Sequence, residues 1–343
     1  MRIGLLGAGR IGAFHGAVLS RHPDVDELVV GDADPGRATA LAERLGATAV
    51  ADVGAVLGAG LDGVVIATAT AAHAELVVRA ADKGVPTFCE KPIALDVEGT
   101  VAVLARTAAA GVPLHVGFQR RFDRDYLAAR DSIESGRLGD LYAIRMVGSD
   151  KEPPPADYVP TSGGIFRDLH IHDFDALRFV TGREVVEVFA WGANRGAEFF
   201  SRHGDSDVTA VVLRLDDHTL ATLGGARQNP AGYDIRMELS GSGGTLAVGL
   251  DDRTPLRPAR SDVDWPAGAP YDGFLDRFAD AYAAELSAFL DLARGRIPSP
   301  CSGSDALEAL YVAEAAQRSA DEGRPVRVDE VRVDKVGVDE VRA

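Results

Sequence analysis

The sequence predicts a two-domain α/β protein, in which a domain built on a parallel sheet precedes an α+β domain with an open, largely antiparallel sheet. Three observations lead to this prediction. The chain has 343 residues, which is long for a single hydrophobic core. Strand-like and helix-like segments alternate over residues 1–119. Beyond them, strand-like segments follow one another with short turns, as in antiparallel sheets.

Composition and charge exclude several classes of protein. A hydrophobic content of 46% with 26% charged residues is ordinary for a globular protein. Glycines interrupt the apolar start of the chain too early for a secretory signal, and no apolar run approaches the ~20 residues of a membrane helix, so we expect a cytoplasmic protein. The net charge of −16 argues against nucleic acid or an anionic membrane as partner. The two cysteines, Cys89 and Cys301, have neither disulfide nor metal-ligand spacing.

The first strand, Arg2–Leu6, runs into the motif Gly7-Ala8-Gly9-Arg10-Ile11-Gly12, which opens a helix. Each glycine of this G-x-G-x-x-G pattern has a purpose in dinucleotide binding. Gly7 permits a tight turn, Gly9 lets a pyrophosphate approach the backbone, and Gly12 lets the helix pack on the strand. The helix N-terminus offers N–H groups and a positive dipole to the phosphates. The motif therefore predicts a dinucleotide-binding, Rossmann-type domain.

Asp32 indicates which dinucleotide is bound. It follows the second strand, Glu27–Gly31, and its carboxylate can accept hydrogen bonds from ribose hydroxyls while repelling a 2′-phosphate. Ala33 and Asp34 come next, so no arginine stands ready for that phosphate, although Arg37 lies nearby. The sequence favours NAD over NADP.

The alternation then continues, with helices expected at 35–45, 73–83 and 97–110 and strands at 61–67, 86–89 and 114–118. Ligands of parallel sheets lie beyond the carboxyl ends of the strands, where Thr68, Glu90-Lys91 and Gln119 stand. Pro92 restricts the backbone of Lys91, which could bind and polarise a substrate hydroxyl or carbonyl. The alternative for Lys91 is a solvated surface lysine.

The second domain is expected to hold helices at 123–135, 274–294 and 304–320, with strands at 141–148, 185–191, 208–215, 219–225, 235–240 and 245–248. Another subunit could cover the second face of this sheet. The segment 328–332 recurs as 338–342, which predicts a disordered tail or an added edge strand. We expect boundaries at 1–119, 120–328 and 329–343.

The most polar candidate site is the stretch Gly163–Asp175. If the glycine pair opens one helix, Asp168 and His172 stand at i and i+4 on one face, and Asp175 follows three residues later. A different side of that helix carries Phe174, Leu177 and Val180 and could be buried. Asp and His at this spacing suit a metal site, an acid/base dyad or a solvated helix face, and the stretch alone leaves these open.

Taken together, the motifs resemble those of the glucose-fructose oxidoreductase / inositol dehydrogenase / rhizopine catabolism (Gfo/Idh/MocA) family. The resemblance rests on the order and spacing of residues 7–12, Asp32, Glu90-Lys91-Pro92, the segment 117–122 and the stretch around Asp168 and His172, and it extends to about residue 328. The proline run at 153–155, the segment 171–175 and Gly232-Tyr233-Asp234 look most like inositol 2-dehydrogenases within it. In one departure, Ala69, Ala71 and Ala72 stand where many relatives have a proline.

The resemblance implies roles for particular residues. Lys91 would bind substrate, Asp168 and His172 would be the catalytic pair, and Asp175 and Tyr233 would contact substrate hydroxyls. The cofactor would be bound by Gly7, Gly9, Arg10, Ile11, Gly12, Asp32, Thr68, His73, Glu90, Lys91 and Gln119. It also implies dimers or tetramers packed through the second sheet, and a structural or salt-bridging role for Arg120-Arg121.

These inferences predict an NAD-dependent dehydrogenase that oxidises a secondary alcohol of a cyclic polyol, myo-inositol first, to the 2-keto inositol. His172 would accept the proton, Asp168 would orient its ring, and Lys91 would stabilise the developing alkoxide, with no metal required. Another inositol isomer, an aldose or a glycoside is the alternative substrate. A non-catalytic NAD- or sugar-sensing regulator is the alternative of another class, and a metal-dependent hydrolase is a further one.

Overall fold

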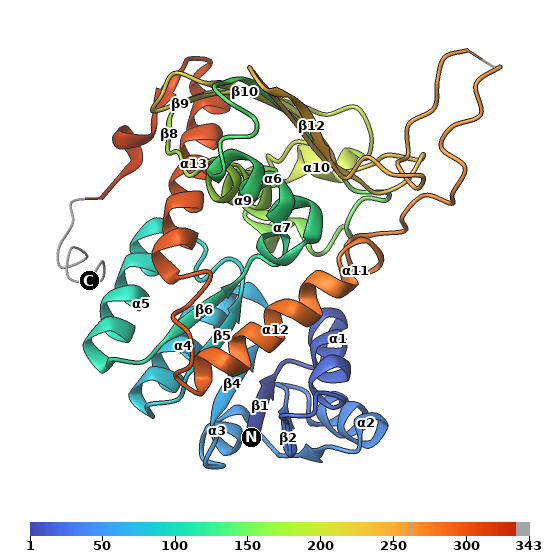
Figure 1. Ribbon diagram of the computed structural model, residues 1–343. Coiled ribbons are helices and arrows are strands. Elements are labelled where there is room, and N and C mark those ends of the chain that lie inside the picture. The colour runs from blue at the N-terminus through green and yellow to red at the C-terminus, as the bar shows by residue number, and fades with distance from the viewer. Residues whose placement is uncertain (261, 334–343) are drawn as a thin grey trace. The chain divides into compact units, whose positions relative to one another are not determined.

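The computed structural model describes residues 1–260 and 262–333, which divide into two units (Figure 1). The first unit contains Met1–Gln119 and Tyr282–Leu307, and the second contains Arg120–Ala281 and Glu308–Arg332. The boundaries expected from the sequence place the segment 282–307 in the second domain. The structure instead assigns it to the first unit, because the apolar face of its helix packs on that unit's sheet.

The sheet of the first unit is parallel throughout, in the order β3-β2-β1-β4-β5-β6, which confirms the predicted parallel sheet. Its strands are β1 (Arg2–Leu6), β2 (Glu27–Gly31), β3 (Thr48–Ala49), β4 (Gly63–Ile66), β5 (Thr87–Glu90) and β6 (Leu114–Gly117). Its helical segments are α1 (Arg10–Leu19), α2 (Pro35–Leu45), α3 (Val53–Leu57), η1 (Thr70–Ala72), α4 (His73–Asp82), α5 (Val97–Ala110) and most of α12 (Ala279–Ala293).

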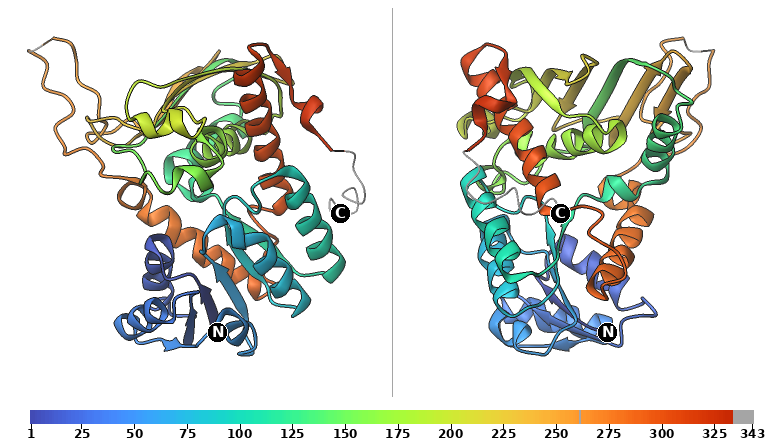
Figure 2. Two further views of the ribbon diagram at one scale, coloured as in Figure 1. Left: turned by 180° about the vertical axis from the view of Figure 1, so that it is seen from behind. Right: turned by 60° about the vertical axis from the view of Figure 1, so that its left-hand side comes forward.

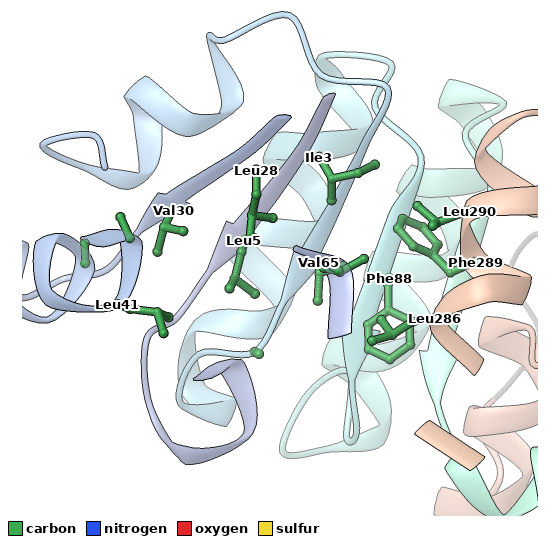
Figure 3. Close-up of a cluster of buried hydrophobic side chains, with 14 of the residues drawn as sticks. Ile3, Leu5, Leu28, Val30, Leu41, Val65, Phe88, Leu286, Phe289 and Leu290 are labelled. Carbon is green, nitrogen blue, oxygen red and sulfur yellow. The ribbon is translucent and has the colours of Figure 1, made fainter. Parts of the chain in front are cut away.

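One face of this sheet carries the apolar core shown in Figure 3. Side chains of β1 and β2 such as Leu5 and Val30 meet Leu41 of α2, while Phe289 and Leu290 of α12 close the side next to β4 and β5. A Cβ on Gly63 would lie 3.1 Å from the Phe289 ring, so a glycine at the start of β4 makes room for that ring. Burial of these aromatic and aliphatic groups explains why the chain returns to the first unit near its end.

The second unit contains a seven-stranded sheet in the order β12-β11-β7-β10-β9-β8-β13. Its strands are β7 (Leu141–Ser149), β8 (Val185–Ala193), β9 (Val208–Leu215), β10 (Leu220–Ala226), β11 (Asp234–Gly241), β12 (Gly244–Val248) and β13 (Val326–Arg327). Neighbouring strands are antiparallel except β7 and β10, which are parallel. β13 is an edge strand on β8 but precedes the repeat. The first copy of the repeat forms the 3-10 helix η3 (Val328–Val331), so the disordered tail or edge strand expected at 328–332 is wrong, and the second copy, at 338–342, lies outside the described residues.

Helical segments of the second unit are η2 (Gln119–Phe122), α6 (Arg124–Glu134), α7 (Val159–Ser162), α8 (Ile165–Asp168), α9 (Ile171–Thr181), α10 (Glu198–Arg202), α11 (Phe274–Arg277), most of α13 (Gly303–Glu322) and η3 (Val328–Val331). The helix expected at 274–294 is interrupted at Phe278, where α11 ends and α12 begins. Within the described ranges, no helix is long and apolar enough to cross a membrane.

The two faces of the second sheet differ in what covers them. Helices α6 and α9 lie on one face, whereas no helix of the described residues lies over the other (Figures 1 and 2). The register places Phe189, Trp191, Val212 and Leu220 together on that open face, and Trp191 and Leu220 remain 55% and 51% exposed. We call these four residues the open-face apolar patch.

A buried charge network lies beneath the covered face of the sheet. Arg120 donates to Oδ1 of Asp173, and Oδ2 of the same carboxylate lies 2.9 Å from Nδ1 of His170. The other ring nitrogen of His170, Nε2, lies 2.7 Å from Thr209 Oγ1. Arg121 donates through Nε and Nη2 to the two oxygens of Asp175, at 2.9 and 2.7 Å. The structural, salt-bridging role expected of Arg120-Arg121 is confirmed.

We expect Asp173→Asn to destabilise the protein by about 3–5 kcal/mol, because it leaves the buried guanidinium of Arg120 without its carboxylate. Burial alone would raise the pKa of Asp173, but Arg120 and His170 outweigh it and hold that pKa below the usual aspartate value. A carboxylate whose pKa is lowered by folding stabilises the folded protein above pH ~4, and this contribution is lost as the pH falls through the folded-state pKa. Urea unfolding of the native protein and of Asp173→Asn should therefore show a difference in the free energy of unfolding that becomes smaller towards acid pH. A difference that does not depend on pH would contradict this.

Candidate active site

The glycine-rich loop between β1 and α1 has the geometry of a phosphate cradle. Gly7 has φ +103°, and a Cβ there would lie 2.4 Å from the carbonyl oxygen of Ala67. A Cβ on Gly12 would lie 2.0 Å from the carbonyl oxygen of Gly7, so both positions require glycine. At Gly9, by contrast, a Cβ would meet no described atom within 4 Å. Open space thus faces the N-terminus of α1, where a pyrophosphate would be bound.

Asp32 is held beside this loop. Its Oδ2 accepts from the backbone N–H of Ala8 at 2.7 Å, and its Oδ1 accepts from that of Asp34 at 2.8 Å. Arg37, a nearby cation that could favour a 2′-phosphate, lies 3.6 Å from the carboxylate of Asp34. The loop and the fixed acid at the end of β2 together fit a dinucleotide with free ribose hydroxyls.

His73 connects two of the predicted strand ends. Its Nδ1 lies 2.8 Å from the carbonyl oxygen of Pro92, and its Nε2 lies 3.1 Å from that of Thr68. The ring is buried, so His73 ties the loop after β4 to the turn that carries Lys91. Lys91 itself follows β5 directly and is partly exposed, and its peptide bond to Pro92 is cis.

Glu90 is positioned by His15, a histidine for which the sequence indicates no role. Nε2 of the fully buried His15, on α1, lies 2.7 Å from Glu90 Oε1, and Phe88 and Tyr282 surround the imidazole. The dinucleotide helix is thereby linked to the turn at Lys91. Gln119, at the end of the first unit, is 2% exposed. The contacts of Thr68, His73, Glu90 and Gln119 with a cofactor stay predictions.

The stretch Gly163–Asp175 is not the single helix that its spacing suggested. Asp168 ends the short helix α8, whereas His172 lies in the first turn of α9. The ladder breaks at His170: its N–H donates back to the carbonyl of Ile165, while its own carbonyl accepts from Phe174. The side chain of His170 belongs to the buried network described above, so tertiary contacts override the local i, i+4 pattern.

Asp168 is held on both carboxylate oxygens. Tyr158 donates its hydroxyl to Oδ1 at 3.0 Å, and Nη1 of Arg227 donates to Oδ2 at 2.8 Å. The same nitrogen lies 3.8 Å from Asp150 Oδ2. Asp150 and Arg227 directly follow the parallel neighbours β7 and β10. Sequence reasoning missed these partners, because only the pairing of β7 with β10 brings them to one end of the sheet.

The other predicted site residues of the second unit are more deeply placed. Nδ1 of His172 is shielded from solvent. Asp175 is fully buried with both oxygens bound by Arg121, and Tyr233 is 5% exposed. Burial raises the pKa of Tyr233 far above its ordinary value, so its hydroxyl stays protonated at neutral pH. Substrate contacts of Asp175 and Tyr233 stay predictions.

This fold and this loop define a dinucleotide-binding protein. Residues 1–118 match the model described as the oxidoreductase family with NAD-binding Rossmann fold, and residues 126–247 match that of the GFO/IDH/MocA C-terminal domain. The chain belongs to the GFO/IDH/MocA oxidoreductase family, as its motifs predicted.

Relatives of known identity agree with this assignment. A myo-inositol dehydrogenase, Hyg17, of Streptomyces leeuwenhoekii is 41% identical over 331 residues, covering 94% of this chain and 98% of the relative. The crystal structure of a myo-inositol dehydrogenase from Corynebacterium glutamicum superimposes with a TM-score of 0.87 at 37% identity, covering 95% and 98% of the two chains. The structure of scyllo-inositol dehydrogenase from Lactobacillus casei with bound NAD(H) and scyllo-inositol gives a TM-score of 0.87 at 27% identity, covering 96% and 99%.

The cofactor predicted from the glycine motif is confirmed. The matched N-terminal family is NAD-binding, and the cradle at Gly9 beside Asp32 fits that dinucleotide. The protein is an NAD-dependent dehydrogenase.

Proposed function

We propose that the protein oxidises a secondary alcohol of a cyclic polyol, with myo-inositol as the first candidate and 2-keto-myo-inositol as its product. The observation that carries this proposal is the combination of the NAD cradle with Lys91, Asp168 and His172 in a chain 41% identical to a myo-inositol dehydrogenase. Relatives whose names give other inositols, such as scyllo-inositol, make the isomer the least constrained part of the proposal.

The proposed chemistry separates hydride transfer from proton transfer. NAD, when bound, supplies the hydride acceptor at nicotinamide C4. His172 would take the hydroxyl proton, since imidazole ordinarily titrates near pH ~6.5. Asp168, fixed by Tyr158 and Arg227, would orient the ring and stabilise its cationic form. Lys91 would stabilise the alkoxide that develops as the proton leaves.

A steady-state screen with NAD⁺ against inositol isomers, aldoses and glycosides tests the substrate. We expect NADH formation with myo-inositol at higher kcat/KM than with glucose. Turnover of an aldose or glycoside alone would replace the polyol in the proposal. NAD binding without turnover of any alcohol would favour the alternative of a non-catalytic NAD- or sugar-sensing regulator.

We also propose that the protein is a cytoplasmic homo-oligomer, a dimer or tetramer, in which a second copy covers the open-face apolar patch. Trp191 and Leu220 are more than half exposed on the open face of the second sheet, which supports an interface there.

Trp191→Asp is therefore expected to shift the protein to a smaller species in analytical ultracentrifugation, because a charge would have to be desolvated at the interface. Its melting temperature should change little at low protein concentration, since the residue lies outside the core. Leu250→Asp, at a residue that is 53% exposed but lies beyond β12, is the matched control. An unchanged mass for Trp191→Asp would place the interface elsewhere.

A further inference from the structure

Arg227 is a buried cation whose charge is directed at a proposed catalytic group. The residue is 2% exposed, and its Nη1 lies 2.8 Å from Asp168 Oδ2 and 3.8 Å from Asp150 Oδ2. Burial alone would lower the pKa of Arg227, but Asp168 and Asp150 outweigh it and raise that pKa. A charge this deeply buried is costly unless it is paired, so Arg227 and Asp168 hold each other in place.

The short helix that carries Asp168 is itself fixed at both ends. Asp205 Oδ1 accepts from the N–H of Ile165 at 2.9 Å, and Nη2 of Arg167 donates to Glu314 Oε2 at 2.6 Å. Tyr158 donates to Asp168 at Oδ1. Where the carboxylate points is thus determined by contacts from four places: the residue after β10, helix α13, the residue before α7 and the segment after α10. A four-residue helix has too few internal hydrogen bonds to do this alone.

We propose that Arg227 is a positioning residue of the dehydrogenase reaction, which orients the Asp168 carboxylate and, through it, the imidazole of His172. The inference rests on the proposed function in taking Asp168 and His172 as the reacting pair. Arg227 donates to Oδ2 of Asp168 and Tyr158 donates to Oδ1, and each carboxylate oxygen has a second lone pair that can accept a further hydrogen bond. Displacing a reacting group by about 1 Å can cost ~10²-fold in rate, so the position of Asp168 matters to kcat more than to substrate affinity.

Arg178 provides a matched control. Like Arg227 it is a largely buried arginine in an ion pair, and this pair is bidentate, with Nε 2.6 Å and Nη2 2.8 Å from the oxygens of Glu184. It lies on α9, six residues beyond His172 and near the other end of that helix. Arg178→Met should therefore lower stability as Arg227→Met does, but leave kcat unchanged.

The test compares Arg227→Met, Arg227→Lys and Arg178→Met by kcat, KM for polyol and NAD⁺, and melting temperature. We expect Arg227→Met to lower kcat ~10- to 10²-fold with little change in KM for NAD⁺, and Arg227→Lys to recover part of the loss by restoring a cation. An unchanged kcat in a folded Arg227→Met protein, or no recovery with lysine, would overturn the proposal.

A double-mutant cycle keeps the proposal testable if Arg227→Met does not fold. If Arg227 acts through Asp168, Arg227→Lys should lower kcat in the native background and have no further effect when Asp168→Asn is present. Additive losses would overturn the inference.

A readout without substrate separates this inference from the proposed function. The Hε1 resonance of His172 in NMR spectra should move in Arg227→Met and stay in place in Arg178→Met, and an unmoved resonance in both contradicts the coupling. If the native protein oxidises no polyol, the proposed function is removed. A shift of the His172 resonance in Arg227→Met would still show the coupling in that case.

Discussion

Replacing His172 with alanine is expected to lower kcat by ~10²-fold or more, because it removes the proposed base that takes the hydroxyl proton as hydride leaves. His172→Gln should lose nearly as much, since its amide keeps a polar side chain but cannot accept the proton. The affinity for NAD⁺, measured by fluorescence titration, should stay within about twofold of the native value, because the cradle at residues 7–12 belongs to the first unit.

His203→Ala is the matched control for this experiment, because His203 is an exposed histidine at the end of α10 to which no role is assigned. The pH profile adds a second criterion: the acidic limb of native kcat/KM should be lost in His172→Ala. A His172→Ala enzyme with native kcat would transfer the role of base to another residue and would leave the Asp168 contacts with a structural purpose.

The fold of the first unit could be predicted because its signals are local. Hydrophobic runs bounded by glycine and proline locate strands such as β1 and β2 to the residue. β3 was missed because Thr48–Ala49 is two exposed residues long and carries no periodicity. The helix α12 was expected, but its attachment to the first sheet was not, because amphipathicity shows that a helix has a buried face and not which sheet buries it.

The candidate site likewise combines residues whose arrangement the sequence predicts with residues whose contacts it does not. Gly7, Gly9, Gly12 and Asp32 lie within one βαβ segment, so spacing alone predicts their arrangement. Arg227 is 59 positions from Asp168. The parallel pairing of β10 with β7 brings Arg227 towards Asp150, and its contact with Asp168 depends in addition on where α8 lies, which no local pattern indicates. The break between α8 and α9 was likewise unpredictable, since it depends on the buried contacts of His170 with Asp173 and Thr209.

Replacing Lys91 with methionine is expected to lower kcat/KM for the polyol by ~10²-fold or more, because a cation that stabilises the developing alkoxide contributes mainly in the transition state. Methionine keeps the apolar stem of the side chain and removes the charge. Arginine should not restore activity, because a planar guanidinium cannot take the place of a compact ammonium at the end of a constrained turn.

The control for Lys91→Met is Lys83→Met, at an exposed lysine that ends α4 in the same unit. If Lys91 is only a solvated surface residue, the two variants will behave alike, and the alkoxide must then be stabilised by another group. A substrate deuterated at the reacting carbon makes the distinction sharper. Loss of alkoxide stabilisation slows hydride transfer itself, so the isotope effect on kcat should rise in Lys91→Met and stay native in Lys83→Met.

Since His73 joins the turn at Lys91 to the loop after β4, His73→Ala should displace the lysine and show a weaker form of the same isotope effect.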